Sequence, residues 1–428
     1  MIRLALFISL TIGWMGVDTI TPDVKPHPDR SLRTFPEPVI EKGYSFINYD
    51  LNKLDHPGRQ NSLYSFYGKL DSLIFDGYGK VNVLHMGGSH VQAGVLSNTM
   101  RENFFSLAPS LRGERGAFFP FRLAHTNSPW NIDLDYTGSW DGFRNSVPKH
   151  ESHWGMTGVT ATTYDSTATV KIWTFDSDSV PYSFSSLKIY HTTDSSSFGL
   201  RLPEKYDVIR SEVDTSAGFT EYVFAGIYDT LEFYLVKELP FQDHFDFQGV
   251  KFETGEPGLT YTSLGVNGAS VPSYLRCQKF VEQLHTAPPD LVIFGIGIND
   301  AYMPSSAFSQ SEFEANYTEL MSQIRETNPR VNFLFLTNND SYYKRRYPNR
   351  NAIEVKESMY KLAKEHNAAV WDLFEVMGGL NSIYTWDQAG LAKSDKIHLT
   401  REGYRLQANM LFHAIRNDFG QYLSMKNQ

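Results

Sequence analysis

Two widely separated stretches of the sequence carry residues that could form a serine nucleophile with its base. Ser89 lies in Gly87-Gly88-Ser89-His90, and His398 ends the run Asp395-Lys396-Ile397-His398. A serine nucleophile needs an imidazole base, and that base needs a carboxylate that fixes its tautomer and stabilises the imidazolium. Taken alone, Ser89 could also be a helix N-cap, and Asp395 and His398 could belong to a surface turn.

Two other stretches could stabilise the negative charge that develops during acyl transfer. Asn299 lies in Gly297-Ile298-Asn299-Asp300, directly after a predicted strand, so its amide could donate a hydrogen bond to an oxyanion. Gly268 and Gly265 lie between Ser263 and Ala269, where a glycine lets a backbone N–H approach a ligand closely. Each of these stretches, taken singly, is also typical of an ordinary turn.

The elements that would position these residues alternate between strands and helices at both ends of the chain. A predicted strand at 81–86 is followed by a helix at 95–105. After Gly265 the pattern predicts helices and strands at 273–284, 290–294, 311–327, 331–336, 353–366, 369–373 and 400–419. This order indicates a parallel sheet with helices on both faces, whose active site is expected at the carboxyl ends of the strands.

The middle of the chain has a different pattern. Residues 167–175, 186–190 and 230–236 alternate between apolar and polar side chains with a period of two, and polar turns separate them. No convincing helix interrupts the region between Phe118 and Phe252. We therefore predict a β-sandwich inserted after the first strand and helix of the α/β part.

Composition and the N-terminus limit the classes of protein and the location. The 428 residues include 39 Lys and Arg against 48 Asp and Glu, a net charge of -9, which argues against a nucleic-acid binder. The one cysteine, Cys277, excludes an internal disulfide and a Cys-based zinc site. A basic start followed by an apolar run at 4–17 is typical of a signal peptide, with an uncleaved anchor as the alternative.

In their order along the chain, the four stretches resemble the four blocks of the SGNH (GDSL-type) hydrolases. Ser89 matches the nucleophile, Gly268 (with Gly265 as second choice) the oxyanion glycine, and Asn299 the oxyanion amide; Asp395 and His398 match the final D-x-x-H block. The resemblance covers about 81–110 and 260–420. One residue departs from the pattern, because Gly88 stands where the family carries the aspartate of G-D-S.

The resemblance implies a fold, and the patterns along the chain add a set of domain bounds. The expected fold is a flavodoxin-like, three-layer α/β/α hydrolase with a parallel sheet and an inserted all-β sandwich. The expected order is a signal peptide at 1–20, a mobile lead-in at 21–60, the first hydrolase part at 61–117, the insert at 118–255 and the second hydrolase part at 256–428.

The resemblance also implies a function. A β-sandwich inserted between the first two blocks makes the chain similar to the peptidoglycan O-acetylesterases. We therefore expect a serine esterase that removes O-acetyl groups from an envelope or extracellular polysaccharide. Ser89 would form an acetyl-enzyme, and the N–H groups of Ser89 and Gly268 with the Asn299 amide would hold the oxyanion. No metal or organic cofactor is expected. The expected location is periplasmic or extracellular, with membrane contact only through an uncleaved leader.

Two alternatives stay open at this point. A polysaccharide O-acetyltransferase of the same fold would use the same triad, and a non-catalytic glycan-binding protein would be a decayed hydrolase. The other polar and aromatic candidates are interpreted as structural or peripheral: His85 as a packed histidine, His90 as a pocket residue, Trp130, Trp140 and Trp154 as groove or core, and Lys344-Arg345-Arg346 as a solvated turn rather than a glycan-phosphate site.

Overall fold

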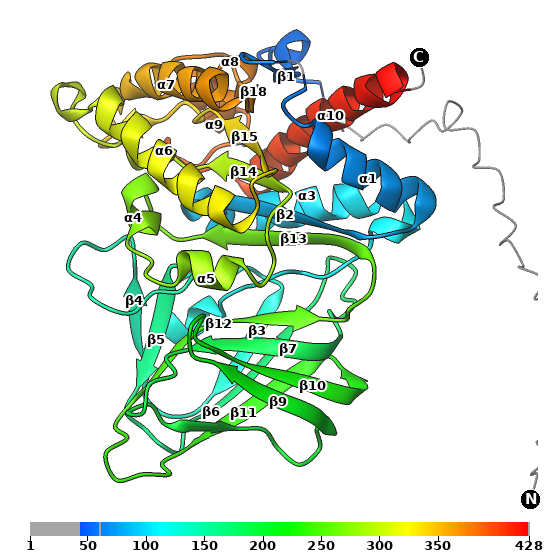
Figure 1. Cartoon of the computed structure of the whole chain (residues 1–428). Helices are drawn as coiled ribbons and strands as arrows, with labels where there is room; N and C mark the ends of the chain where they lie inside the picture. The colour runs from blue at the N-terminus through cyan, green and yellow to red at the C-terminus, as the bar shows by residue number, and fades with distance from the viewer. Residues whose placement is uncertain (1–42, 60, 427–428) are drawn as a thin grey trace, which may run out of the picture. The chain divides into compact units, whose positions relative to one another are not determined.

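The computed structural model of the chain describes residues 43–59 and 61–426. The predicted signal peptide and residues 21–42 of the predicted lead-in lie outside these described residues. Within them, the central element is a six-stranded sheet with strand order β1-β18-β15-β14-β2-β13 (Figure 1). Its strands are β1 (Leu54–Asp55), β2 (Lys80–Gly87), β13 (Gly258–Gly265), β14 (Leu291–Gly295), β15 (Asn332–Leu336) and β18 (Ala369–Trp371). From β18 to β13 neighbouring strands run parallel, and β1 pairs antiparallel with β18 at the edge.

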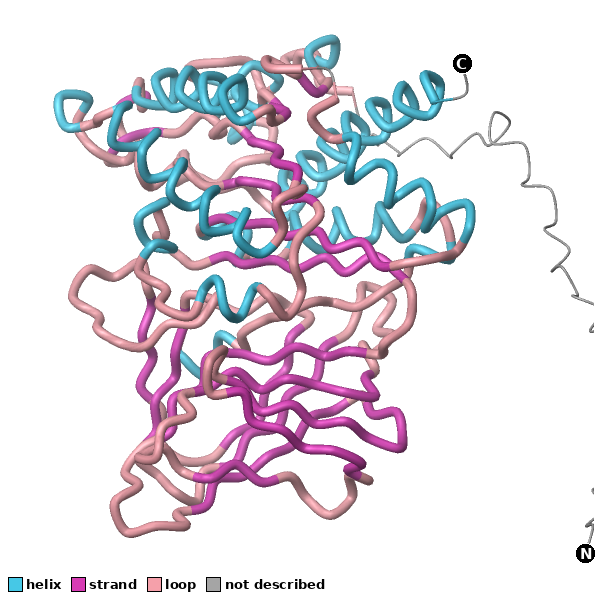
Figure 2. The backbone as a smooth tube through the Cα atoms, viewed as in Figure 1, coloured by secondary structure: helices cyan, strands magenta, loops and turns pink. Residues whose placement is uncertain are grey.

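Helices cover both faces of this sheet (Figure 2). Strand side chains alternate between the faces, so Val81 and Val83 of β2 join one buried cluster, while Leu84 and Met86 join the other. The first cluster includes side chains of α1 (Tyr64–Asp76), α3 (Val95–Phe105) and α10 (Arg401–Lys426). The second includes side chains of α4 (Val271–Leu275), α5 (Phe280–Leu284), α6 (Gln310–Thr327) and α7 (Asn351–His366). The arrangement confirms the predicted three-layer α/β/α fold.

Helix α6 illustrates how the sequence produces these layers. Its buried residues recur every three or four positions, from Phe313 to Ile324, and so form one apolar face against the sheet. The helix begins after Ser309, whose hydroxyl accepts a hydrogen bond from the Glu312 N–H and so satisfies one of the free donors of the first turn.

The middle of the chain forms two antiparallel sheets, with strand orders β4-β5-β12-β7-β10-β9 and β3-β6-β11-β8. Their strands are β3 (Ile132–Tyr136), β4 (Asp141–Arg144), β5 (Val159–Thr163), β6 (Thr169–Thr174), β7 (Phe184–His191), β8 (Gly199–Arg201), β9 (Val208–Asp214), β10 (Phe219–Tyr228), β11 (Thr230–Val236) and β12 (Phe245–Glu253). These antiparallel sheets agree with the predicted all-β insert. Their strands, β3 to β12, lie in sequence between β2 and β13, two neighbours of the parallel sheet. The bounds 118–255 stay a prediction.

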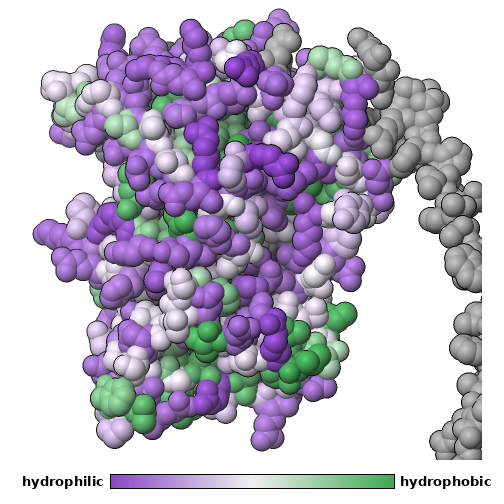
Figure 3. Space-filling view, in the orientation of Figure 1, coloured by the Kyte–Doolittle hydropathy of each residue, from purple (hydrophilic) through white to green (hydrophobic). Residues whose placement is uncertain are grey.

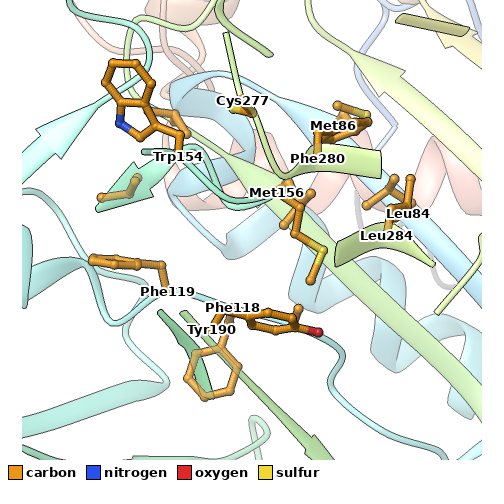
Figure 4. Close-up of a cluster of buried hydrophobic side chains, with 14 of the residues drawn as sticks. Leu84, Met86, Phe118, Phe119, Trp154, Met156, Tyr190, Cys277, Phe280 and Leu284 are labelled. Atoms are coloured by element: carbon orange, nitrogen blue, oxygen red, sulfur yellow. The ribbon is translucent and has the colours of Figure 1, made fainter. Parts of the chain in front are cut away.

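The insert and the α/β part share a continuous hydrophobic core. Leu84 of β2 and Phe280 of α5 belong to the same buried cluster as Phe118, Trp154 and Met156 of the middle region (Figure 4). Trp140 and Trp154 are both only 2% exposed, so they are core residues and do not line a sugar groove. In contrast, strand β9 at one edge is exposed along most of its length, and hydrophobic side chains gather over the sandwich in Figure 3.

Three sequence predictions need correction. Leu54 and Asp55 lie in the predicted lead-in, yet they form β1 of the main sheet. The predicted helix 273–284 is two short helices, because the Lys279 N–H donates to the Trp154 carbonyl of the insert instead of continuing the helix. The last helix extends beyond the predicted residue 419 to Lys426. No helix among residues 43–59 and 61–426 has the length and apolar character needed to cross a membrane.

Candidate active site

The turn after β2 places Ser89 at the start of the short helix α2 (Ser89–Gln92). Gly87 ends the strand, and a Cβ at this position would lie 2.3 Å from the Val91 side chain. A Cβ at Gly88 would lie 2.9 Å from Asn299 Nδ2. Both glycines are therefore required by close packing, and the side chain that the family carries at position 88 would have to displace the Asn299 amide.

Ser89, His398 and Asp395 form one chain of hydrogen bonds, although 309 positions separate the serine from the histidine. Ser89 Oγ lies 2.8 Å from His398 Nε2, and His398 Nδ1 lies 2.8 Å from Asp395 Oδ2. A hydroxyl, an imidazole and a carboxylate in this order have the geometry in which the imidazole can accept the hydroxyl proton. The structure thus brings the three predicted side chains together at hydrogen-bond distance.

The carboxylate of Asp395 is held in its ionised form. Burial opposes ionisation, but the hydrogen bonds from the His398 ring and from the backbone N–H groups of His398 and Ile397 outweigh it and hold the pKa well below its ordinary value. An ionised Asp395 accepts a hydrogen bond from Nδ1–H, so Nε2 of a neutral His398 is left as the acceptor that faces Ser89.

A tight turn shapes the loop that carries this pair. Lys396 has a φ of 59°, in the left-handed region, and the Lys393 N–H donates to the His398 carbonyl over 2.8 Å. The Tyr342 N–H donates to the Lys396 carbonyl, and the Asn339 side chain donates to the Ile397 carbonyl. The strained residue is thus fixed by neighbouring loops at the carboxyl edge of the sheet. Thr400 caps the helix that follows, because its hydroxyl accepts the Gly403 N–H.

Ser89, His398, Asn299 and Gly268 line one pocket with a volume of about 480 Å³. Gly268 has a φ of 83°, which favours glycine, and its N–H donates to no acceptor within the described part of the chain. Asn299 Nδ2 uses one hydrogen on the Ala269 carbonyl at 2.9 Å, and an amide nitrogen carries two. One N–H of each residue therefore stays available to a ligand.

Gly265, the second choice for the oxyanion glycine, does not line this pocket. A Cβ there would lie 2.3 Å from the Gln92 backbone nitrogen, so this glycine allows α2 to pack against the end of β13. Gly265 thus has a packing role.

His90 does not line the pocket either, contrary to the interpretation of the sequence. Its ring stacks on that of His398, with centroids 5.2 Å apart, and its Nδ1 lies 2.9 Å from the Tyr404 hydroxyl. Burial, followed by the neighbouring His398, lowers the pKa of His90 to about 3, so this ring is neutral at physiological pH. His85 is fully buried and bonded to the Tyr261 hydroxyl, which confirms it as a packed histidine.

Several residues of the pocket were not predicted. Asn127 comes from the region predicted as insert, and Asn267 donates its N–H to Gln92 Oε1 while accepting from the Ser146 hydroxyl of the insert. Tyr302 and Lys393 also line the pocket. Nothing in the spacing of these residues indicates the site, since each reaches it only through tertiary packing.

Asp300, next to Asn299, is buried and accepts the N–H of Val271 at the start of α4. Burial raises the pKa of its carboxyl to about 7.

Among residues 43–59 and 61–426, no group of three or more His, Cys, Asp and Glu side chains is arranged to hold a metal ion.

Comparison with known proteins bears on this geometry. Residues 249–406 match the model of the GDSL-like Lipase/Acylhydrolase family. The chain is a carboxylic ester hydrolase that resembles the SGNH (GDSL-type) family. No curated protein matches the sequence of this chain.

Solved structures resemble this esterase over different lengths. A peptidoglycan O-acetylesterase shares 18% identity, covers 86% of this chain and 99% of its own, and has a TM-score of 0.67. An acetyl xylan esterase, with 19% identity, covers 37% of this chain and 81% of its own, with a TM-score of 0.30. A lipase/acylhydrolase from Enterococcus faecalis, with 20% identity, covers 38% and 77%, also with a TM-score of 0.30. At these identities the first similarity establishes a shared fold, including the antiparallel sheets.

Proposed function

We propose that this esterase removes O-acetyl groups from an envelope or extracellular polysaccharide of the peptidoglycan type, with Ser89 as nucleophile. The observation that carries the proposal is the continuous set of hydrogen bonds from Ser89 Oγ through His398 to Asp395, at the wall of a pocket that Asn299 and Gly268 also line. The fold shared with a peptidoglycan O-acetylesterase over 99% of that chain supports the choice of substrate class.

The first half of the reaction forms an acetyl-enzyme. Ser89 Oγ attacks the acetyl carbonyl carbon while His398 Nε2 takes the hydroxyl proton, and Asp395 stabilises the resulting imidazolium. The carbonyl oxygen becomes an oxyanion, which accepts hydrogen bonds from the N–H groups of Ser89 and Gly268 and from Asn299 Nδ2. When the intermediate collapses, the sugar oxygen leaves with the proton from His398.

The second half releases acetate. His398 removes a proton from water, the hydroxide attacks the acetyl-Ser89 carbonyl, and the same donors hold the second oxyanion. Ser89 leaves with the proton from His398, so the enzyme returns to its initial state. Buried His90, stacked on His398, is neutral and therefore does not compete for the transferred proton.

The predicted leader at 1–20 and the structural similarity to a peptidoglycan enzyme both support an envelope location for this activity. Detection of the chain in the periplasmic or extracellular fraction of expressing bacteria would test the location. Retention in the cytoplasm would contradict it.

The activity is tested first with 4-nitrophenyl acetate and then with O-acetylated peptidoglycan and acetylated xylan, by measuring acetate release. We expect Ser89→Ala to lower kcat/KM on the order of a thousandfold or more, because the covalent step is lost. Ser106→Ala is the matched control, since this exposed hydroxyl bonds only the Asn103 carbonyl. Equal rates for the wild type and Ser89→Ala, with both folded by circular dichroism, would reject the serine mechanism.

Acetate release also separates hydrolysis from transfer. With an acceptor oligosaccharide present, an esterase releases free acetate, whereas a transferase produces the acetylated acceptor. Dominant transfer over hydrolysis would replace the esterase proposal with the polysaccharide O-acetyltransferase alternative.

A further inference from the structure

Two cationic side chains, Arg345 and Lys393, line the same pocket as Ser89 and His398. Neither has a carboxylate within ion-pair distance among residues 43–59 and 61–426. By contrast, Lys396, three residues after Lys393, is ion-paired with Asp387 and stacked over the Tyr384 ring. The charge of Lys396 is thus satisfied within the protein, while the charges at 345 and 393 face the pocket.

The hairpin that carries Arg345 has an unusual sequence for its backbone. Strands β16 (Tyr342–Tyr343) and β17 (Tyr347–Pro348) are joined by a turn in which Lys344 and Arg345 both have positive φ, at 51° and 58°. Turn positions with positive φ favour Gly and Asn, because the Cβ of most other residues is strained there. The positive φ values of Lys344 and Arg345 show that surrounding contacts, and not local preference, hold this turn in place.

Hydrogen bonds fix this hairpin to the active-site loops. The Tyr342 N–H donates to the Lys396 carbonyl over 2.8 Å, and the Lys344 N–H donates to the Tyr302 hydroxyl over 3.0 Å. Tyr302 lines the pocket itself and packs edge-on against the Tyr343 ring. The tip that presents Arg345 is therefore positioned by the elements that also carry His398 and Asn299.

Lys393 is fixed by the turn of the D-x-x-H block. Its N–H donates to the His398 carbonyl, and its own carbonyl accepts the Lys396 N–H. Its position beside the imidazole is thus set by the backbone, and an anion bound between Lys393 and Arg345 would lie within the pocket where the acetyl ester must sit.

We propose that Arg345 and Lys393 form a subsite for an oxyanion, a carboxylate or a phosphate, carried by the glycan close to its acetyl ester. The proposal rests on the proposed function, whose substrate it narrows to an acidic acetylated glycan. The planar guanidinium of Arg345 can bind an oxyanion through two parallel hydrogen bonds, and the Lys393 ammonium adds a point charge. Peptidoglycan supplies such groups as the lactyl or stem-peptide carboxylates of its muramyl residues.

The test compares esters that differ in one charge. The substrates are a disaccharide containing 6-O-acetyl-N-acetylmuramic acid and the same compound with its lactyl carboxylate converted to the primary amide. We expect the wild type to have a kcat/KM for the acid about tenfold above that for the amide, the size of one charge-assisted hydrogen bond. The preference should shrink in 0.5 M NaCl, because the pocket is open to solvent.

Variants locate this preference. Arg345→Gln and Lys393→Gln should each lower the acid-to-amide ratio from about ten toward one, while Arg345→Lys should retain most of it. Arg346→Gln is the matched control, since this exposed neighbour in the same turn does not line the pocket. The readout is a ratio for one protein preparation, so a general loss of active enzyme does not change it.

Each outcome decides between the proposals. Equal kcat/KM for acid and amide in the wild type, or a ratio that survives both Gln variants, would overturn the subsite while leaving the esterase intact. Hydrolysis of 4-nitrophenyl acetate without hydrolysis of either sugar ester would instead overturn the proposed function and the subsite with it. A 6-O-acetyl-N-acetylglucosamine 1-phosphate that is preferred over the muramic acid ester would support the same subsite with phosphate as its ligand.

Discussion

At the scale of single residues, Gly88 lies where the turn that carries Ser89 comes close to the Asn299 amide. The family carries aspartate at this position. Here, a Cβ on residue 88 would lie only 2.9 Å from Asn299 Nδ2. The Asn299 amide lies close to the turn, and a side chain at position 88 would come into conflict with it. The departure from G-D-S therefore coincides with a close fit between this turn and the Asn299 amide.

We predict that Gly88→Ala lowers kcat for 4-nitrophenyl acetate by about 10- to 100-fold, because the Asn299 amide must shift and one oxyanion donor is weakened. Gly226→Ala, whose Cβ would meet nothing nearer than 3.5 Å, should leave kcat unchanged. Steady-state kinetics provide the measurement.

A double-mutant cycle tests the stated cause. If Gly88→Ala acts through Asn299, then adding it to Asn299→Ala should cost little further activity. Independent, multiplicative losses in the double variant would show that Gly88 supports the turn in some other way.

At the scale of elements, helix α10 offers two glycines in opposite environments. A Cβ at Gly403 would lie 2.0 Å from the Leu391 carbonyl oxygen, a backbone atom that cannot easily move. A Cβ at Gly420 would meet nothing within 4 Å. The first glycine is required where the helix packs against the loop before the Asp395 turn, while the second weakens the helix by adding freedom to the unfolded chain.

Gly420→Ala should accordingly raise the free energy of unfolding by about 0.5–1 kcal/mol, whereas Gly403→Ala should lower it by about 1–3 kcal/mol. Urea titrations followed by circular dichroism measure both. A destabilised Gly420→Ala would contradict the assignment of an unobstructed position in the helix.

Elements also show what the sequence could and could not predict. The helix 95–105 and the strand after Asp290 were predicted closely, because their apolar residues recur with a clear period. The break between α4 and α5 was missed, since it depends on a bond from Lys279 to Trp154, far away in the sequence. β1 has two residues, too few for any period, and Arg345 reaches the pocket only through the folded hairpin. Ser89, Asn299, Asp395 and His398 were recognisable because their family order is a sequence pattern.

At the scale of the whole molecule, Arg276 connects the two parts of the core. Its guanidinium donates to the carbonyls of Asn145, Val147 and His150 and stacks over the Trp154 ring. Those carbonyls belong to the middle region, and Ser146 beside them bonds the Asn267 carbonyl next to Gly268. The antiparallel sheets are thus attached to the wall of the pocket.

We expect Arg276→Met to lower the free energy of unfolding by about 2–4 kcal/mol, since several partly buried carbonyls lose their donor. Arg210→Met, which removes only exposed ion pairs with Glu212 and Glu221, should cost about 1 kcal/mol or less. Differential scanning calorimetry distinguishes the two. Equal losses would mean that Arg276 contributes no more than a surface charge.

The position of β13 has a further consequence, for the order in which the chain can fold. β13 pairs in parallel with β2 along eight residues, from Gly258 opposite Lys80 to Gly265 opposite Gly87, yet the whole sandwich lies between these neighbours in sequence. Pairing across so large a loop is slow unless the intervening chain is already compact, because the entropy of closing the loop must be overcome first. We therefore expect β2 to stay unpaired on this side until the sandwich has folded, so that shortening the insert would change the rate of folding.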